Sequence, residues 1–474
     1  MKEKKLGLTG LIGLVIGGII GAGIFSLPSE LAKGAGGLAI LIGFIVSGIG
    51  VLALAFVYYI LSVRKPNLKN GIYSYSKEGF GEFIGFNSAW IYWISSTLGN
   101  ISYATLVFGT LSYFFKIFNP AGNNLAAIIG ASLLIWIINF LILRGVKQAL
   151  VINAIVNISK LIPILLFVVI TIIAFNYKNI SFQFFGTESL GSIYTQVKAT
   201  MISNLWAFGG IEAAVVLSAR AKRSKDVGKA TVIGIIGVII IYMLVTFLSL
   251  GVMKRPDIAA LNNPSLAFIL QSVVGTWGAV VITITLLVSV IGALLGWTLI
   301  TAEMPYSTAV DGVMPKFLAK ENKNGTAYYA IMITTIITQF WLLFSYFYNS
   351  GYEFLYSLSS TASLIPYFLN TLYLLKLIFT KETYKENSKG IIKHGFIALI
   401  SLVYTVWLLG AAGWKYTLFS SIISAFGLIL YVWNRKEKKK NLFNHAYEVV
   451  IAIIIIALAI ITLYLIFTGR LSTN

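Results

Sequence analysis

Long apolar segments, separated by short polar loops, recur along the whole chain. They lie at about residues 8–32, 38–62, 88–115, 125–143, 151–175, 196–218, 230–253, 273–303, 327–348, 353–375, 394–412, 416–433 and 447–468. A helix needs about 20 mostly apolar residues to cross the hydrocarbon core of a bilayer. The pattern therefore predicts an all-α membrane protein with about 12–13 transmembrane helices.

The same pattern predicts the domain organisation. Residues 1–435 are expected to form a core with helices 1–12, and residues 436–474 a basic linker followed by an additional transmembrane helix. The first apolar run, from Leu8 to about Ala32, is long, and no small-residue cleavage site follows a short apolar core. It is therefore expected to be a retained first helix rather than a signal peptide.

The composition supports lipid as the solvent and excludes several classes of chemistry. Only 11% of the residues are charged and 58% are hydrophobic, whereas soluble domains carry about 25% charged residues. The chain has no cysteine, and its two histidines, His394 and His445, lie in predicted polar loops. No thiolate chemistry, metal site or cofactor is expected. No P-loop, HExxH motif or suitably spaced pair of carboxylates is found, so an enzyme is not expected.

The net charge of +20 is distributed as a topology signal. If the N-terminus is cytoplasmic and the segments alternate, lysine and arginine concentrate in the inner loops, for example at residues 64–77, 220–229, 376–393 and 435–440. This bias predicts a multi-pass protein of the inner, cytoplasmic membrane. The basic loops are expected to contact anionic lipid, and nucleic acid is not expected as a partner.

Two of the segments are interrupted by glycines near their middle. The first contains Gly21 and Gly23, and the sixth contains Gly209 and Gly210. The two breaks occupy corresponding positions if the first ten helices form two halves of five. This predicts a five-plus-five inverted-repeat transporter fold with broken helices 1 and 6 and a substrate site near the bilayer midplane.

An unwound helix frees N–H and C=O groups where no water can reach them. An amino acid supplies partners for both, because its carboxylate suits the N-terminus of a half-helix and its ammonium suits free carbonyls. The alternative is that the glycines only allow close helix packing, which we favour for Gly13 and Gly17. For Gly21, Gly23, Gly209 and Gly210 we favour the binding site.

Few ionisable residues lie deep within the apolar segments, where a charge costs roughly 2.5–3.5 kcal/mol. Lys160 lies in the fifth segment and Glu212 at the break of the sixth. Lys160 is either a tether for carbonyls of an unwound helix or a titrating group, and both roles are compatible. Glu212 is either a carboxyl that ties helices together or a gating carboxylate beside the substrate, and we favour the second.

Several motifs resemble those of the amino acid–polyamine–organocation transporters, over about residues 7–435. Gly21-Ala22-Gly23-Ile24-Phe25 with Pro28 resembles their first-helix motif, and residues 204–212 (NLWAFGGIE) resemble their sixth-helix motif. The Gly-Trp-Thr-Leu run at 296–299, with the loop at 311–315, resembles the eighth helix and the loop after it. Within this superfamily, residues 73–113 and 218–228 are most similar to the basic amino acid/polyamine antiporter branch, and to the bacterial arginine/ornithine antiporters in particular.

The resemblance implies roles for individual residues. The substrate-binding residues would be Gly21, Ala22, Gly23, Asn100, Trp206, Gly209, Gly210 and Trp297, and the gating and coupling residues would be Tyr92, Lys160 and Glu212. The glycine motif would bind the carboxylate through backbone N–H groups, Trp206 would gate the site, and Asn100 and Trp297 would meet a cationic side chain. Gly209 stands where many relatives carry a bulkier residue, which predicts a larger pocket.

Together these features predict a secondary transporter of amino acids, an arginine/ornithine antiporter that works by alternating access. Its partners are expected to be amino acids, as small-molecule substrates, and membrane lipid, with a homodimer as an open alternative. Return of an empty site would leave backbone groups and a buried carboxylate unpaired, which favours exchange. The alternatives are a proton-coupled permease and an amino acid/amine exchanger linked to decarboxylation.

Overall fold

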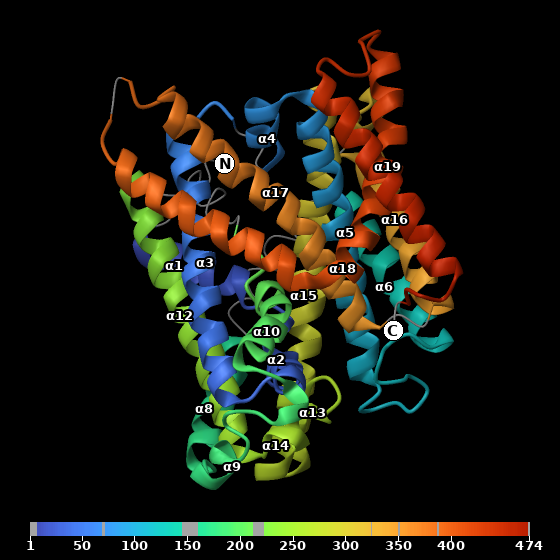
Figure 1. The fold of residues 1–474 in the computed structure, drawn as a ribbon. Helices are drawn as coiled ribbons and strands as arrows, with labels where there is room; N and C mark the ends of the chain where they lie inside the picture. Colours follow the sequence, from blue (N-terminus) through green and yellow to red (C-terminus); the bar gives the residue numbers. More distant parts are fainter. Residues whose placement is uncertain are drawn as a thin grey trace. The chain divides into compact units, whose positions relative to one another are not determined.

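The computed structural model describes residues 7–68, 72–144, 160–211, 222–323, 325–348, 351–385 and 388–472. All regular secondary structure in these ranges is helical (Figure 1), so the prediction of an all-α membrane protein is confirmed. Among the described residues, eight helices are long and apolar enough to cross a membrane, and nine if the bent pair at the N-terminus counts as one span.

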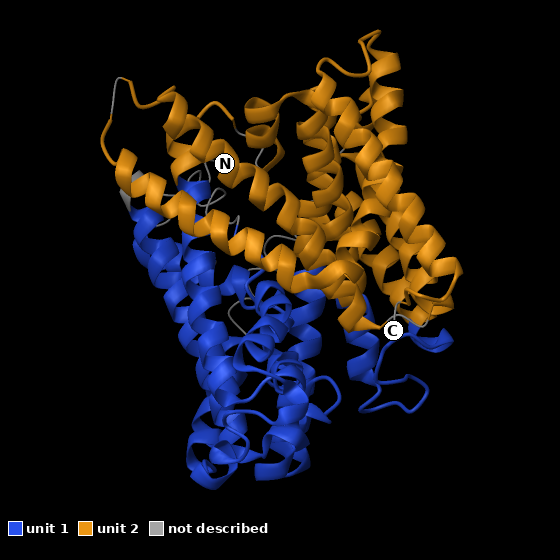
Figure 2. Cartoon of the chain, viewed as in Figure 1, with its two compact units in different colours: residues 1–59, 103–127, 150–294 blue, residues 60–102, 128–149, 295–474 orange. Residues whose placement is uncertain are grey.

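The chain divides into two compact units (Figure 2), which are residues 1–59, 103–127 and 150–294 and residues 60–102, 128–149 and 295–474. The first unit contains α1 (Leu8–Ile19), α2 (Gly23–Gly34), α8 (Leu161–Ile173), α9 (Tyr177–Ser181), α10 (Ile193–Ala207), α12 (Ser224–Val252), α13 (Arg255–Ala259) and α14 (Ser265–Val274). The second contains α4 (Ile72–Phe80), α16 (Tyr328–Phe347), α17 (Tyr352–Thr380), α18 (Ile391–Glu437) and α19 (Ala446–Phe467). Four helices run from one unit into the other: α3 (Gly37–Arg64), α5 (Glu82–Leu111), α6 (Leu125–Arg144) and α15 (Thr276–Val310).

Every predicted apolar segment corresponds to a helix or a pair of helices. The third, α5, is 30 residues long and carries many polar residues on its buried surface. The fifth and sixth overlap α8 and α10, and the remainder of these segments includes residues 151–159 and 212–218, which lie outside the described ranges. The eleventh and twelfth are the two parts of α18, which meet at Gly413, where the backbone is not helical (φ 78°, ψ 171°).

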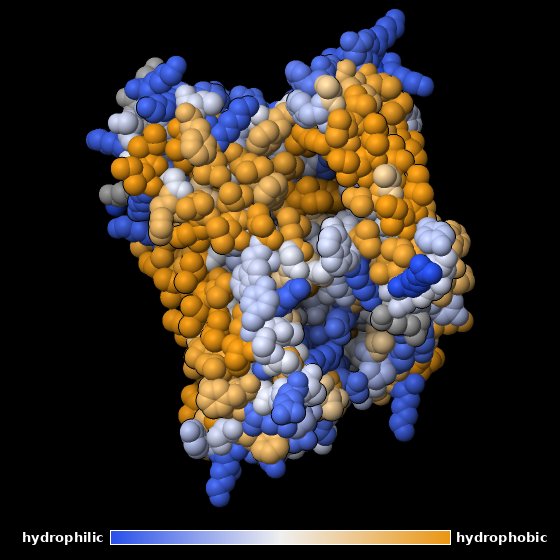
Figure 3. All heavy atoms as spheres, in the orientation of Figure 1, coloured by the Kyte–Doolittle hydropathy of each residue, from blue (hydrophilic) through white to orange (hydrophobic). Residues whose placement is uncertain are grey.

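Several helices carry apolar side chains on outer surfaces that would be polar in a soluble protein. Hydrophobic residues gather on the outer faces of α12 in the first unit and of α19 in the second (Figure 3). In α19 only 17% of the most apolar window is buried, and Ile453 and Ile460 are 60% and 61% exposed. Such faces require lipid as their solvent, and a continuous helix leaves few backbone groups unsatisfied there.

Charged and polar contacts within the second unit connect the linker and the start of α19 to the end of α4 and the start of α5. The Glu82 carboxylate accepts hydrogen bonds from Arg435 and from Lys440, the latter at 2.8 Å. The Tyr447 hydroxyl donates to the carbonyl of Phe80 at 3.0 Å. A boundary at residue 435 stays a prediction, but residues on both of its sides hold the same carboxylate.

Candidate functional site

The first break separates α1 from α2, whose axes are bent by 52°. α1 ends at Ile19 and Ile20 is extended (φ −67°, ψ 97°), so Gly21 and Ala22 form the connection to α2. The N–H groups at the start of α2 and the carbonyls at the end of α1 lack partners within their own helices. The break therefore presents donors and acceptors side by side, as the sequence predicted.

The second break follows α10. The helix ends at Ala207, the N–H of Gly209 donates to the carbonyl of Trp206 at 3.0 Å, and Gly210 has a φ of +93°. This left-handed conformation favours glycine and turns the chain out of the helix. Glu212, assigned to gating, lies outside the described residues.

The two breaks meet within the first unit. A Cβ atom added at Gly23 would lie 3.0 Å from the Cα and 3.3 Å from the Cβ of Ala207. It would also lie 3.5 Å from Cδ1 of Trp206. Gly23 therefore has a packing role in addition to the binding role predicted for it, because no side chain fits between the start of α2 and the end of α10.

Trp206 lies at this junction with an aromatic neighbour that the sequence analysis did not identify. Its ring centroid is 5.3 Å from that of Tyr103, at an interplanar angle of 45°. A Cβ atom added at Gly21 would be 3.5 Å from the Tyr103 hydroxyl, so Tyr103 lies against both the first break and Trp206. Its only signal in the sequence is its position, one helical turn after Asn100 on α5.

Carbonyl groups at the end of α1 that have no partner within the helix accept hydrogen bonds from side chains elsewhere in the first unit. The Lys160 ammonium, 3% exposed at the start of α8, donates to the carbonyl of Gly17 at 2.7 Å. This is the contact expected of a tether. A charged donor suits a site without water, because its hydrogen bond is stronger than a neutral one.

Tyr242, on α12, supplies the second donor and was also not predicted. Its buried hydroxyl lies 2.8 Å from the carbonyl of Ala207 and 3.2 Å from that of Ile19. A phenol has one hydrogen to donate, so it serves one of the two carbonyls at a time. Tyr242 thereby connects the ends of both broken helices, α1 and α10.

The residues predicted to meet the substrate side chain lie in the second unit. Asn100 is 3% exposed, and its amide nitrogen donates to the Thr301 hydroxyl at 3.2 Å. Its carbonyl oxygen is buried without a hydrogen-bond partner in the described part of the chain. Trp297, half-buried, lies one helical turn before Thr301 on α15, and Tyr92 is buried on α5.

The unpaired oxygen of Asn100 is chemically informative. A buried acceptor without a donor costs roughly 1–3 kcal/mol, so such a group either binds water or awaits a ligand. The donors that complement it are N–H groups, which are abundant on an ammonium or a guanidinium. The indole of Trp297, on the helix that holds Thr301, is the best aromatic partner for such a cation.

The chain is similar to known transporters over nearly its full length. The model of the amino acid permease family matches residues 6–415. An arginine/ornithine antiporter of Pseudomonas aeruginosa is 42% identical over 479 residues, which is 99% of each chain. An arginine/agmatine antiporter of Chlamydia caviae is 38% identical, covering 99% of this chain and 98% of the relative. A putative arginine/ornithine antiporter of Escherichia coli K12 is 40% identical, covering 96% and 98%.

Proposed function

Because the chain belongs to the amino acid permease family, we propose that it is a secondary antiporter that exchanges arginine for ornithine by alternating access. The observation that carries the proposal is the meeting of two broken helices at Gly23 and Ala207, in a chain 42% identical to an arginine/ornithine antiporter. Two half-helix ends at one place provide both kinds of backbone partner that an α-amino acid needs.

The α-amino and α-carboxyl groups are assigned to the two helix breaks. The N–H groups of Gly21, Ala22 and Gly23 would bind the carboxylate at the N-terminus of α2, where the helix dipole favours an anion. Gly209 and Gly210 would bind the ammonium through carbonyls freed by the second break. Trp206 would cover the substrate, since its ring already lies beside the backbone of Gly23.

The cationic end of the substrate is assigned to Asn100 and Trp297. The Asn100 oxygen would accept a hydrogen bond from the guanidinium or ammonium, and the Trp297 indole would stack against the same cation. Arginine and ornithine share a positive charge at the end of an aliphatic chain, so one site of this kind can hold either. Tyr92, Lys160 and Glu212 are assigned to gating and coupling.

Obligatory exchange follows from the cost of an empty site. Without a substrate, the N–H groups assigned to the carboxylate and the Asn100 oxygen would lie in a low-dielectric site without partners, at several kcal/mol in total. A conformational change that seals this site from water is therefore slow when the site is empty. Binding of either substrate removes the cost and permits return.

Arginine/agmatine exchange is the second candidate, since a relative of that name is 38% identical over almost the whole chain. Agmatine is arginine without its carboxylate, so it would leave the N–H groups of the first break without an anionic partner. We therefore expect agmatine to bind more weakly than ornithine. A proton-coupled permease is the third candidate, with Lys160 as the titrating group.

Labelled arginine uptake into proteoliposomes separates these functions. We expect rapid uptake into vesicles loaded with ornithine, slower uptake into vesicles loaded with agmatine, and background uptake into empty vesicles. Faster uptake with agmatine than with ornithine would support the second candidate. Equal uptake into empty and loaded vesicles, increased by an inward proton gradient, would support the proton-coupled permease.

Tyr242→Phe is expected to slow exchange about tenfold, because the variant leaves two buried carbonyls with one donor fewer, at roughly 1–3 kcal/mol. The measurement is the initial rate of labelled arginine uptake into ornithine-loaded vesicles. Tyr194→Phe is the matched control, since Tyr194 belongs to the same unit and is 65% exposed. An unchanged rate in Tyr242→Phe would show that this hydroxyl does not support the breaks.

The protein is a multi-pass membrane protein, and we place it in the cytoplasmic membrane with its N-terminus inside. The support is the concentration of lysine and arginine in alternate loops. Because the chain has no cysteine, a single Glu3→Cys variant reports the side of the N-terminus. Labelling of that cysteine by an impermeant maleimide in intact cells would contradict the assignment.

A further inference from the structure

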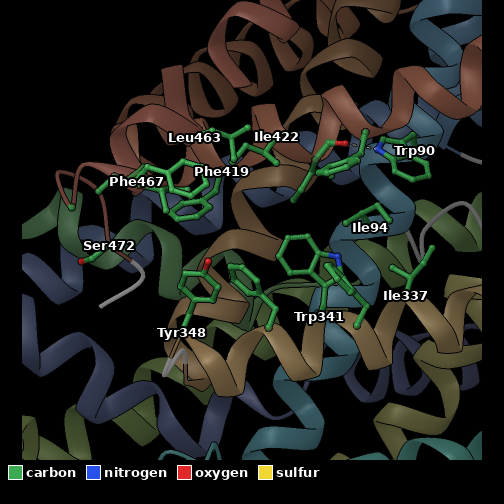
Figure 4. A pocket seen from close by; sticks show the side chains of 17 residues that line it. Trp90, Ile94, Ile337, Trp341, Tyr348, Phe419, Ile422, Leu463, Phe467 and Ser472 are labelled. Atoms are coloured by element: carbon green, nitrogen blue, oxygen red, sulfur yellow. Dashed lines mark hydrogen bonds between the residues drawn. The ribbon is translucent and has the colours of Figure 1, made fainter. Parts of the chain in front are cut away.

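A cavity of about 640 Å³ lies within the second unit (Figure 4), and neither Asn100 nor Trp297 lines it. Its walls come from four helices, α5, α16, α18 and α19, and from the residues that follow α19. Phe419, Ile422 and Leu463 form one wall, and Trp341 faces them from α16. The volume is in the range of about 300–1,000 Å³ that is typical of small-molecule sites.

The cavity has a polar end and an apolar end. Tyr348 and Ser472 lie at one end, where α16 and α19 terminate, whereas Trp90 and Ile337 lie at the other (Figure 4). At the apolar end the indole N–H of Trp90 already donates to the carbonyl of Ile423 at 2.7 Å. A ligand there meets mainly hydrocarbon and aromatic rings, while a ligand at the other end meets hydroxyl groups.

The length of the cavity matches one leaflet of a membrane. Along α16 its lining extends from Ile337 to Tyr348, and eleven residues at 1.5 Å each correspond to about 16 Å. The hydrocarbon core of a bilayer is about 30 Å thick, so one leaflet contributes about half of it. The polar end also coincides with the ends of membrane-crossing helices, where lipid head groups lie.

A cationic residue is a sequence neighbour of two residues that line the cavity. Arg470 is exposed and lies between Gly469 and Leu471, both of which line the cavity. A guanidinium binds phosphate oxygens in a bidentate manner. The polar end is therefore complementary to an anionic head group, and the apolar end to a hydrocarbon chain.

We propose that this cavity is a binding site for one acyl chain of an anionic phospholipid, with its head group beside Arg470. The acyl chain of the lipid lies between α16 and α19, and its end contacts Trp90. The site belongs to the leaflet in which α16 and α19 terminate. It takes a ligand class different from the transported amino acids, and it does not depend on the proposed exchange of arginine and ornithine.

Native mass spectrometry of the purified full-length chain tests the proposal, after reconstitution with equal amounts of dioleoyl phosphatidylglycerol and dioleoyl phosphatidylcholine. We expect about one phosphatidylglycerol per chain to survive detergent washing. Leu463→Trp fills the cavity and is expected to lower this retention about fivefold or more, as overpacking of an apolar site does. Ile453→Trp is the matched control on α19, at a 60% exposed position that does not line the cavity.

Arg470→Gln is expected to remove the preference for phosphatidylglycerol while leaving a retained lipid. Retention that is equal in Leu463→Trp and Ile453→Trp would overturn the site, and an unchanged preference in Arg470→Gln would overturn the head-group assignment. If the wild-type protein is detected as a lipid-free dimer and the Leu463→Trp variant as a monomer, a second copy of the protein fills the cavity instead of a lipid. If Leu463→Trp is not recovered as folded protein, Ile422→Trp fills the same space from α18.

Discussion

Gly23→Val is expected to lower the rate of amino acid exchange about 100-fold or more. The first atom of the new side chain would lie 3.0 Å from the Cα of Ala207, which is backbone and cannot rotate away. The two broken helices would have to separate, and overpacking of this kind costs about 1–3 kcal/mol or more. A penalty of about 2.7 kcal/mol on the assembled site corresponds to a factor of 100.

The matched control for this variant lies one turn before the break, on α1. Gly18 is exposed, and a Cβ atom added there would meet nothing within 4 Å, so Gly18→Ala is expected to exchange arginine at the wild-type rate. Both variants are compared by initial uptake into ornithine-loaded vesicles, normalised to the amount of reconstituted protein. Gly23→Val that exchanges at the rate of Gly18→Ala would refute the close contact between the breaks.

Trp297→Leu is expected to raise the arginine concentration at half-maximal uptake about 30-fold. The reason is that a desolvated cation–π contact contributes about 2 kcal/mol, and leucine supplies bulk without a negative ring face. Trp297→Phe keeps an aromatic face and is expected to lose less. Concentration dependence of labelled arginine uptake measures both.

Trp277→Leu provides the control for a lost tryptophan on the same helix. Trp277 is at the start of α15 and is 52% exposed, so its replacement is expected to leave arginine uptake unchanged. An arginine affinity in Trp297→Leu equal to that of the wild type would remove the stacking role. The cationic end of the substrate would then depend on Asn100 alone.

Much of the fold could be predicted from the sequence because a bilayer imposes a simple rule on length and hydropathy. All predicted segments correspond to helices in the described ranges, and even the division of α18 at Gly413 was expected from the two segments that it joins. The short helices α4, α9, α13 and α14 were not predicted. They are too short or too polar to produce a hydropathy signal, and tertiary contacts rather than propensity stabilise elements of this length.

The site was predictable where glycine marks an interruption and unpredictable where a common residue completes it. Glycines stand out in an apolar segment, so both breaks were located. Tyr103, Tyr242 and Thr301 are ordinary residues of buried helices, and only the three-dimensional packing shows which carbonyl, ring or amide each one meets. The role of Glu212 remains a prediction.

The contacts around Glu82 bear on how the protein can be engineered. Its carboxylate is held from one side by Arg435 and from the other by Lys440, so a cut between these two residues would leave a carboxylate at the start of α5 with one cation instead of two. Deletion or exchange of α19, the thirteenth predicted helix, together with the linker before it would therefore remove a contact to Glu82, so a shorter transporter is not obtained without this loss. A tag or fusion partner attached at the C-terminus leaves Glu82, Arg435 and Lys440 unchanged.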